Sequence, residues 1–272
     1  MTVDEQKRCA ALAALDHLRP GMRLGLGSGA AVEHFVRALA RRAREGLEVE
    51  CIASSAAMFD LASRAGLQMT ILDHDIMRSL GEHAQAVEGA QADASRTPDP
   101  GEAGHGRLPL SACEGAPMLD LMVEGADEID ANLAFNHSRE GALLLGKILA
   151  CTAREVLVIA DQAARVGMLG GVPLAIEVAR HGVSATAASI RQVLRNAGLS
   201  GVLSMRVRGS RPLFTDGGNV VIDAVVGDIA DPRGMEAALK MIPGVVACSL
   251  YVALCTSLIV GSEGGAVMVR RR

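Results

Sequence analysis

The stretch RLGLGSGAAVEHFVRALA, residues 23–40, contains the pattern that decides the fold. Residues 23–27 form a short apolar run that predicts a strand, and the apolar residues from Val32 to Ala40 recur at helical spacing. Glycines between a strand and a helix allow close backbone approach, and the free amides at a helix start favour an anion. We therefore predict a phosphate-binding loop whose residues are Gly25, Gly27, Ser28, Gly29 and Ala30.

Two other interpretations of this loop remain open. Its G-x-G-x-x-A spacing also fits the dinucleotide-binding fingerprint, which expects an acidic residue at the end of the second strand. The chain instead has Ala53, Ser54 and Ser55 there, and two hydroxyls suit phosphate or sugar oxygens better than a ribose-binding carboxylate does. The third interpretation is a tight turn that only packs the helix on the sheet.

Strand and helix patterns alternate on both sides of this loop. Strands are predicted at residues 49–53, 68–72, 119–123 and 155–160, and helices at residues 56–65 and 140–152. Gly66 is expected to end the first of these helices. This alternation is typical of a mainly parallel, Rossmann-like sheet.

A different pattern begins at Pro173. Strands are predicted at residues 174–178, 202–208, 219–225 and 245–250, and helices at residues 185–197 and 232–241. Strand, helix, two strands, helix, strand is the ferredoxin-like plan. The last two predicted strands, residues 257–260 and 266–269, are expected to return to the first domain.

The predicted fold class is therefore α/β, with a Rossmann-like domain and a second, smaller ferredoxin-like α+β domain. We assign residues 1–171 plus 249–272 to the first domain and residues 172–248 to the second. Residues 81–117 contain four prolines and no sustained period, so they are expected to form an inserted surface excursion that is dispensable for folding.

Composition excludes several classes of function. The 272 residues are 50% apolar and 21% charged, with four Phe, one Tyr and no Trp, so the core must be aliphatic. Modules that stack bases on aromatic side chains are disfavoured. The chain has a net charge of −4, so it also lacks the excess of basic residues expected for binding nucleic acid or an anionic membrane.

The cysteines and the N-terminus predict a cellular location. The six cysteines include no CxxC pair and most lie in apolar runs, which indicates buried thiols in a reducing compartment. The N-terminus shows no secretory signal, and no apolar stretch approaches the roughly 18 residues of a membrane span. We expect a soluble cytoplasmic protein.

An acidic cluster, EGADEID at residues 124–130, follows a predicted strand. Ligands of open α/β sheets bind at the carboxyl ends of strands. The cluster is either a solvated acidic loop or a site for Mg²⁺ or Ca²⁺, because carboxylates without neighbouring thiols or imidazoles suit hard cations. The nearest histidine is His137, which gives a zinc site little support.

Several segments together resemble the ribose-5-phosphate isomerase A family. The family's loop G-x-G-T-G-S-T-A-x-x-F is similar to residues 25–35, its S-S turn to Ser54 and Ser55, and its D-G-A-D-E-[IV]-D to residues 124–130. Further similarities in the same order are T-x-D-E-x-K at residues 2–7, V-I-A-D at 158–161, P-L-x-[IV]-E-V at 173–178, T-D-x-G-N at 215–219 and I-P-G-V-V at 242–246.

The resemblance implies the interconversion of ribose 5-phosphate and ribulose 5-phosphate, a step of the pentose phosphate pathway. This chemistry runs through an enediolate by general acid–base catalysis, without a metal or another cofactor. The implied partner is a small sugar phosphate. The small domain of the family often serves in oligomer contacts, so a homo-oligomer, a dimer or a tetramer, is expected.

The resemblance carries over well at the phosphate side. Lys7, Ser28, Gly29, Ser54 and Ser55 occupy family binding positions. Ala30 and Ala31 replace the second Ser-Thr pair of the family's loop.

The reacting groups carry over poorly. His137 replaces a lysine, Gly146 replaces the glutamate that moves the proton, and Ala164 replaces a second lysine. Glu124 replaces the first aspartate of the acidic loop, and Asp127 is retained.

The candidate catalytic residues are Asp127, Glu124, His137 and Glu140. On a continuous helix Glu140 would lie about 9 Å along the axis from Gly146 and be rotated by roughly 240°, so it would act only from a preceding loop. His137 is either a group that polarises a carbonyl or shuttles a proton, or an ordinary loop residue. The chain is accordingly either an isomerase, with relocated acid–base groups or another substrate, or a non-catalytic sugar-phosphate-binding paralogue or assembly protein.

Overall fold

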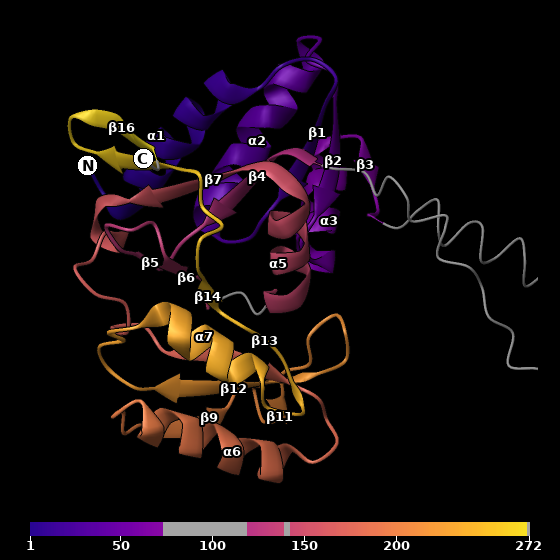
Figure 1. Ribbon diagram of the computed structural model, residues 1–272. Helices are drawn as coiled ribbons and strands as arrows, with labels where there is room; N and C mark the ends of the chain where they lie inside the picture. Colours follow the sequence, from indigo (N-terminus) through magenta and orange to yellow (C-terminus); the bar gives the residue numbers. More distant parts are fainter. Residues whose placement is uncertain (73–118, 139–141, 271–272) are drawn as a thin grey trace, which may run out of the picture. The chain divides into compact units, whose positions relative to one another are not determined.

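The computed structural model describes residues 1–72, 119–138 and 142–270. Its larger sheet has seven strands in the order β16-β15-β7-β4-β1-β2-β3 (Figure 1). The strands are β1 (Met22–Leu26), β2 (Val49–Ala53), β3 (Met69–Thr70), β4 (Leu119–Gly125), β7 (Ala153–Asp161), β15 (Ser257–Ser262) and β16 (Gly265–Arg270). β1 pairs in parallel with β2 and β4, and β7 pairs in parallel with β4 and β15. The predicted mainly parallel sheet is confirmed.

Helices α1 (Val3–Ala14) and α2 (Ala30–Arg44) pack on this sheet through an aliphatic core. Phe35 is the one aromatic residue of that core, among Leu, Val, Ile and Ala side chains. Thr2 and Glu5 form a capping box that fixes the start of α1, because each side chain accepts a hydrogen bond from the backbone of the other.

Several predicted boundaries match the structure. β2, α3 (Ala56–Ala65) and β8 (Leu174–Val178) begin and end at the predicted residues. Gly66 ends α3 with a φ of 90°, a left-handed conformation that a residue without Cβ adopts readily.

Two predicted strands of the small domain are each divided. Residues 202–208 become β9 (Val202–Met205) and β10 (Val207–Arg208), separated by Arg206, whose side chain pairs with Asp223. Residues 245–250 become β13 (Val245–Cys248) and the start of β14 (Leu250–Tyr251). Hydrophobic alternation reveals neither break, because the apolar pattern continues across both.

The smaller sheet has the order β13-β8-β12-β9, and every pairing in it is antiparallel. Helices α6 (Val183–Asn196) and α7 (Pro232–Lys240) bury Ile190, Leu194, Met235 and Leu239 against one face of this sheet. β12 covers Val220–Val225. The predicted ferredoxin-like plan of strands and helices is confirmed (Figure 1).

Helix α5 (Leu143–Thr152) contacts both sheets. Its first residue, Leu143, packs against Ala175, Val221 and Ala247 of the small sheet, while other residues of α5 contact β4 and β7. The predicted start of this helix at residue 140 lies outside the described residues.

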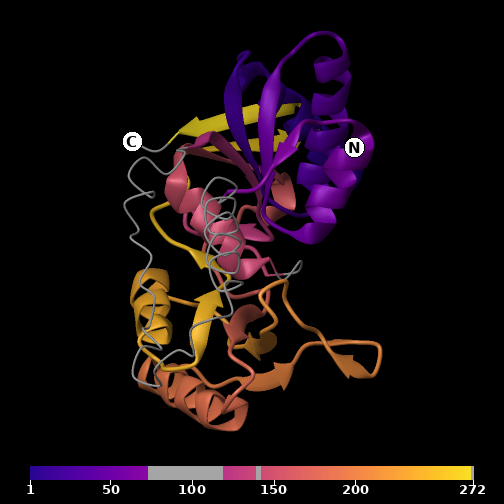
Figure 2. The ribbon, with the colours of Figure 1, turned by 90° about the vertical axis from the view of Figure 1, so that its right-hand side faces the viewer.

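The last two strands return to the larger sheet, as predicted. β15 pairs in parallel with β7, and β16 pairs antiparallel with β15. Figure 2 shows these yellow strands beside the indigo and purple N-terminal part of the chain. Residues 1–69 and 119–272 form one compact unit that contains both sheets, and the domain boundaries given above stay a prediction. The predicted excursion at residues 81–117 lies outside the described residues.

The edge strand β9 is exposed and apolar. Val202 is 71% exposed and Met205 is 41% exposed, and neighbouring Val225 of β12 is also exposed. Unpaired edges of this kind favour contact with another chain. They support the expected homo-oligomer, which stays a prediction.

Three cysteines are buried as predicted, namely Cys51, Cys248 and Cys255. Burial raises the pKa of the Cys51 thiol to about 12, so this thiol stays protonated. Cys151 is exposed, which contradicts the expectation for that residue, and Cys113 lies outside the described residues. In the described ranges no helix combines the length and the apolar character needed to cross a bilayer.

Candidate active site

The site lies where the strand order of the larger sheet reverses. From β1 the chain proceeds to β2 on one side, and β4 lies on the other side. Gly27 N donates to Val123 O at 2.9 Å, and Ser54 N donates to Leu26 O at 2.8 Å. The loops after β1, β2 and β4 therefore meet at one edge, the position where open α/β sheets bind ligands.

Glu124 is the carboxylate at the centre of this edge. Its Oε1 accepts hydrogen bonds from Ser28 N at 2.8 Å and Gly125 N at 3.0 Å, and the side chain is almost fully buried. Gly27 is required beside it, because a Cβ at that position would overlap the carboxylate. Burial raises the pKa of Glu124 above its ordinary value of 4.5.

His137 lies between two carboxylates and a hydroxyl. Its Nε2 shares a hydrogen bond with Ser28 Oγ at 2.8 Å and lies 3.7 Å from Glu124 Oε1. Its Nδ1 lies 3.7 Å from Asp127 Oδ2 and has no hydrogen-bond partner within the described ranges. The imidazole thus connects Asp127 and Glu124 with Ser28.

Glycines and backbone amides hold this cluster in place. A Cβ at Gly29 would lie 3.2 Å from His137 Cε1, and one at Gly125 would lie 3.5 Å from the same atom, so the ring occupies a slot between two glycines. Ser138 N donates to Asp127 Oδ2 at 2.8 Å. His137 directly follows β6 (Phe135–Asn136), which pairs with β5 (Glu128–Ile129) and β14.

A cavity of about 560 Å³ opens beside Ser28 and Gly29. Helices α3 and α5 supply an apolar wall that includes Met58, Leu61 and Leu145, and the small domain supplies Arg208 and Asp216. These residues come from segments far apart in the sequence.

Two side chains near the N-terminus of α3, Asp216 and Ser54, differ in their hydrogen bonding. Asp216 Oδ2 accepts from Ala56 N at 2.8 Å, at the first residue of this helix. Ser54 lines the cavity, and its buried Oγ has no hydrogen-bond partner among the described residues. Ser54 therefore retains an unused donor for a ligand.

The structure separates the predicted phosphate-side residues into two groups. Ser28, Gly29, Ser54 and Ser55 line the cavity. The cavity lining does not include Gly25, Gly27, Ala30 or Lys7. Gly25 faces Leu119 and Met122, and Gly27 faces Glu124. Ala30 is exposed at the start of α2, and Lys7 Nζ lies 3.7 Å from Asp161 Oδ2.

Three of the four predicted catalytic residues come together, namely Asp127, Glu124 and His137. Glu140 lies outside the described residues. Among the described residues, no group of three His, Cys, Asp or Glu side chains is arranged to hold a metal ion, either at this site or elsewhere.

Sequence reasoning missed Tyr251. A Cβ at Gly146 would lie 2.6 Å from the Tyr251 hydroxyl and 3.5 Å from Glu124 Oε2. Tyr251 is fully buried and stacks on Phe135 with ring centroids 4.4 Å apart. Tyr251 is the chain's one tyrosine, which is the single feature of the sequence that marks it out. Nothing in the sequence connects it with Gly146.

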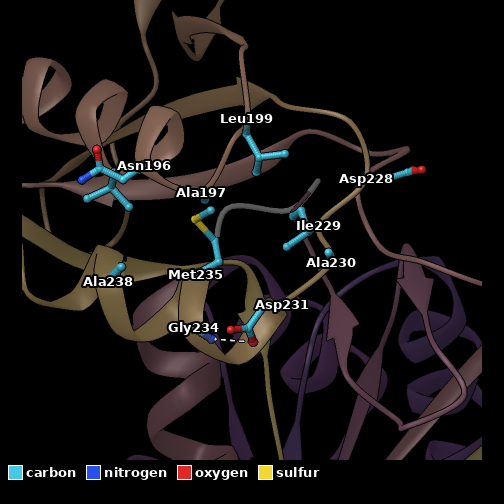
Figure 3. A pocket seen from close by; sticks show the side chains of 11 residues that line it. Asn196, Ala197, Leu199, Asp228, Ile229, Ala230, Asp231, Gly234, Met235 and Ala238 are labelled. Atoms are coloured by element: carbon cyan, nitrogen blue, oxygen red, sulfur yellow. Dashed lines mark hydrogen bonds between the residues drawn. The ribbon is translucent and has the colours of Figure 1, made fainter.

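A second cavity, of about 460 Å³, lies in the small domain between α6 and α7 (Figure 3). Leu199, Ile229 and Met235 give it an apolar lining. Asp231 lies at its edge, where its Oδ1 accepts from Gly234 N at 2.9 Å as the cap of α7. This cavity contains none of the predicted site residues.

Comparison with known proteins identifies the family. The model of the family described as ribose 5-phosphate isomerase A (phosphoriboisomerase A) matches residues 101–265. The chain is also 35% identical to ribose-5-phosphate isomerase A of Parvibaculum lavamentivorans, over 97% of both chains. The chain belongs to the ribose-5-phosphate isomerase A family. The protein of that name from Nitrobacter hamburgensis is 36% identical over the full length of both chains.

A solved structure of a ribose-5-phosphate isomerase A relative supports the fold. A D-ribose-5-phosphate isomerase in complex with phospho-erythronic acid superposes with a TM-score of 0.78 at 27% identity, covering 100% of both chains. The two-sheet architecture described above is thus that of the ribose-5-phosphate isomerase A family.

Within this ribose-5-phosphate isomerase A fold, a side chain from another segment occupies the space beside Gly146. The resemblance implies a glutamate there, and the Tyr251 hydroxyl occupies the space that its Cβ would need. Glu124, one carbon longer than the aspartate that the resemblance implies, directs Oε2 toward the same place. Ala164, in place of a lysine, is buried in the 3-10 turn Gln162–Ala164.

Proposed function

We propose that this chain is an aldose–ketose isomerase of a phosphorylated pentose, interconverting ribose 5-phosphate and ribulose 5-phosphate. The observation that carries the proposal is family membership along essentially the whole chain. The phosphate-type loop supports it as well, because Ser28 and Gly29 line the cavity and Ser28 N contacts Glu124 of the acidic loop.

Enolisation needs a base that moves a proton between two neighbouring carbons. Glu124 is the carboxylate we assign to this step, in place of the side chain absent at Gly146. Its Oε1 is fixed by two amides, and its Oε2 lies toward Gly146. Burial raises the pKa of Glu124, which makes its ionised carboxylate a stronger base.

The oxygens of the enediolate need hydrogen-bond donors or acids. We assign this role to His137, which contacts Ser28 at the cavity wall and is flanked by Asp127. An imidazole between a hydroxyl and a carboxylate can pass a proton in either direction.

The phosphate is expected at the opening between α2 and α3. The first amides of α2 have no acceptor within the helix, and Gly29 gives no side-chain cap. Ser54 Oγ adds a donor, and Arg208 adds a positive charge at the cavity wall. Glu33, also at this wall, is paired with Arg37 at 2.7 Å.

An aldose-to-ketose assay on ribose 5-phosphate, with a panel of other phosphorylated aldoses, tests the proposal. We expect turnover of ribose 5-phosphate or of a related phosphorylated aldose. Gly146 favours the other candidate, a non-catalytic sugar-phosphate-binding paralogue. Calorimetry with phospho-erythronic acid separates the two, since binding without turnover of any sugar would establish the paralogue.

Ala30→Asp is expected to weaken binding of phospho-erythronic acid by about tenfold or more, a loss of about 1.4 kcal/mol. A carboxylate at the first residue of α2 repels a phosphate there, yet it favours the helix itself. Calorimetry on the wild type, Ala30→Asp and the neutral control Ala30→Asn measures this. Equal affinity for Asp and Asn at position 30 would place the phosphate elsewhere.

A further inference from the structure

The side chains of Ser28, His137 and Asp127 are arranged in a way that suits a second reaction. We propose that Ser28, His137 and Asp127 form a nucleophile, base and orienting acid that transfer an acyl group from a small carboxylic ester to water. The proposal goes beyond isomerisation and does not depend on it, because a serine nucleophile needs no phosphorylated sugar.

The first observation is the contact between hydroxyl and imidazole. Ser28 Oγ lies 2.8 Å from His137 Nε2, within the distance at which a histidine takes the proton of an attacking serine. Ser28 is among the residues that line the cavity of about 560 Å³, and His137 is not. Ser28 is thus the member of the pair that a ligand in the cavity can reach.

The second observation concerns the other side of the imidazole. His137 Nδ1 is buried without a hydrogen-bond partner among the described residues, and Asp127 Oδ2 is 3.7 Å away. Ser138 N holds that carboxylate oxygen in place at 2.8 Å. A shift of about 1 Å would complete the hydrogen bond, and such contacts are often long before substrate binds.

The backbone supplies the third component. Ser28 lies on the sharp turn between β1 and α2, and the next residue, Gly29, has a φ of 95°. Gly29 is the N-cap of α2 and gives no side-chain cap, so the first amides of the helix have neither a side-chain cap nor an acceptor within the helix. Amides beside a serine at a helix start stabilise the oxyanion of a tetrahedral intermediate.

The cavity indicates the class of substrate. Its wall next to the serine turn is apolar, with Met58, Leu61 and Leu145, and it suits the hydrocarbon part of a small ester. An uncharged ester also avoids repulsion by the buried carboxylate of Glu124 and the partly buried carboxylate of Asp127.

The reaction balances without a further reactant. Ser28 Oγ forms a bond to the ester carbonyl carbon while His137 Nε2 takes the serine proton. The carbon–oxygen bond to the alcohol then breaks, and His137 returns the proton to the leaving oxygen. Water attacks the acyl-serine by the same path in reverse, which releases the carboxylic acid and restores Ser28.

Hydrolysis of p-nitrophenyl acetate by the full chain tests the proposal, together with labelling by a fluorophosphonate and mapping of the label by mass spectrometry. We expect the label on Ser28. Ser28→Ala is expected to lower the enzyme-dependent hydrolysis rate by about 10²-fold or more, and His137→Gln by a similar factor, because the two groups act as a unit.

The matched controls are Ser63→Ala and His181→Gln, which change exposed residues outside the cavity. Both are expected to hydrolyse the ester as the wild type does. The labelling experiment uses the wild type, so the test does not depend on the folding of the His137 variant. Label on residues other than Ser28, or hydrolysis that Ser28→Ala leaves unchanged, would overturn the proposal whatever the isomerase assay shows.

Discussion

Glu124→Gln is expected to lower kcat for isomerisation by about 10²–10⁴-fold, the usual contribution of a positioned general base. The amide keeps the shape of the side chain, and its oxygen can still accept from Ser28 N and Gly125 N. It has no charge with which to take a proton from carbon. Steady-state rates on the sugar that the wild type turns over, with the exposed control Glu45→Gln, measure the effect.

Binding separates this result from a loss of the site. Phospho-erythronic acid is expected to bind Glu124→Gln about as well as the wild type in calorimetry. A rate unchanged by the substitution would exclude Glu124 as the base and would direct the search to Glu140.

The raised pKa of Glu124 also predicts the pH dependence of the same pair of proteins. Burial makes the folded state hold this proton more tightly than the unfolded state does. The folded state therefore binds more protons, and the free energy of unfolding falls as the pH rises from 4.5 through the raised pKa. Glu124→Gln should lack this fall in urea unfolding followed upward from pH 4.5. The wild-type rate should rise with pH as the base ionises.

Gly146→Glu is expected to destabilise the protein by about 1–3 kcal/mol when introduced alone, because its Cβ would lie 2.6 Å from the Tyr251 hydroxyl. Adding Tyr251→Phe removes that atom and leaves the ring carbon Cζ at 3.9 Å, an ordinary contact. The double variant should recover most of the lost stability. It should also isomerise ribose 5-phosphate about 10²-fold faster than Tyr251→Phe alone, since it regains a carboxylate at the position that the resemblance assigns to the base.

Thermal unfolding and the isomerase assay on the two single variants and the double variant complete a mutant cycle. Tyr251→Phe is the matched control, because it removes the hydroxyl beside Gly146 without adding a carboxylate. A double variant that is stable yet no faster than this control would show that the space at Gly146 is not where a proton is moved.

Local patterns predicted the elements of this fold well because they depend on neighbours in the chain. Apolar alternation placed β2 and β8 at their observed ends, and a residue without Cβ stopped α3 at Gly66. The order of the motifs along the chain indicated the family before any contact was known. The acidic loop with Glu124 and Asp127 followed from its place at the carboxyl end of a predicted strand, and His137 followed from the family resemblance.

Only the tertiary structure decided how those residues are used. His137 meets Ser28 because β6 pairs with β5 and β14. Tyr251 reaches the space beside Gly146 because it pairs with Phe135 in this three-stranded sheet, β14-β6-β5. Lys7 is expected from the motif to bind phosphate, yet its ammonium lies beside Asp161. Such encounters depend on strand pairing between segments far apart in the chain, and hydrophobic periodicity has no information about them, because it records burial and not the partner.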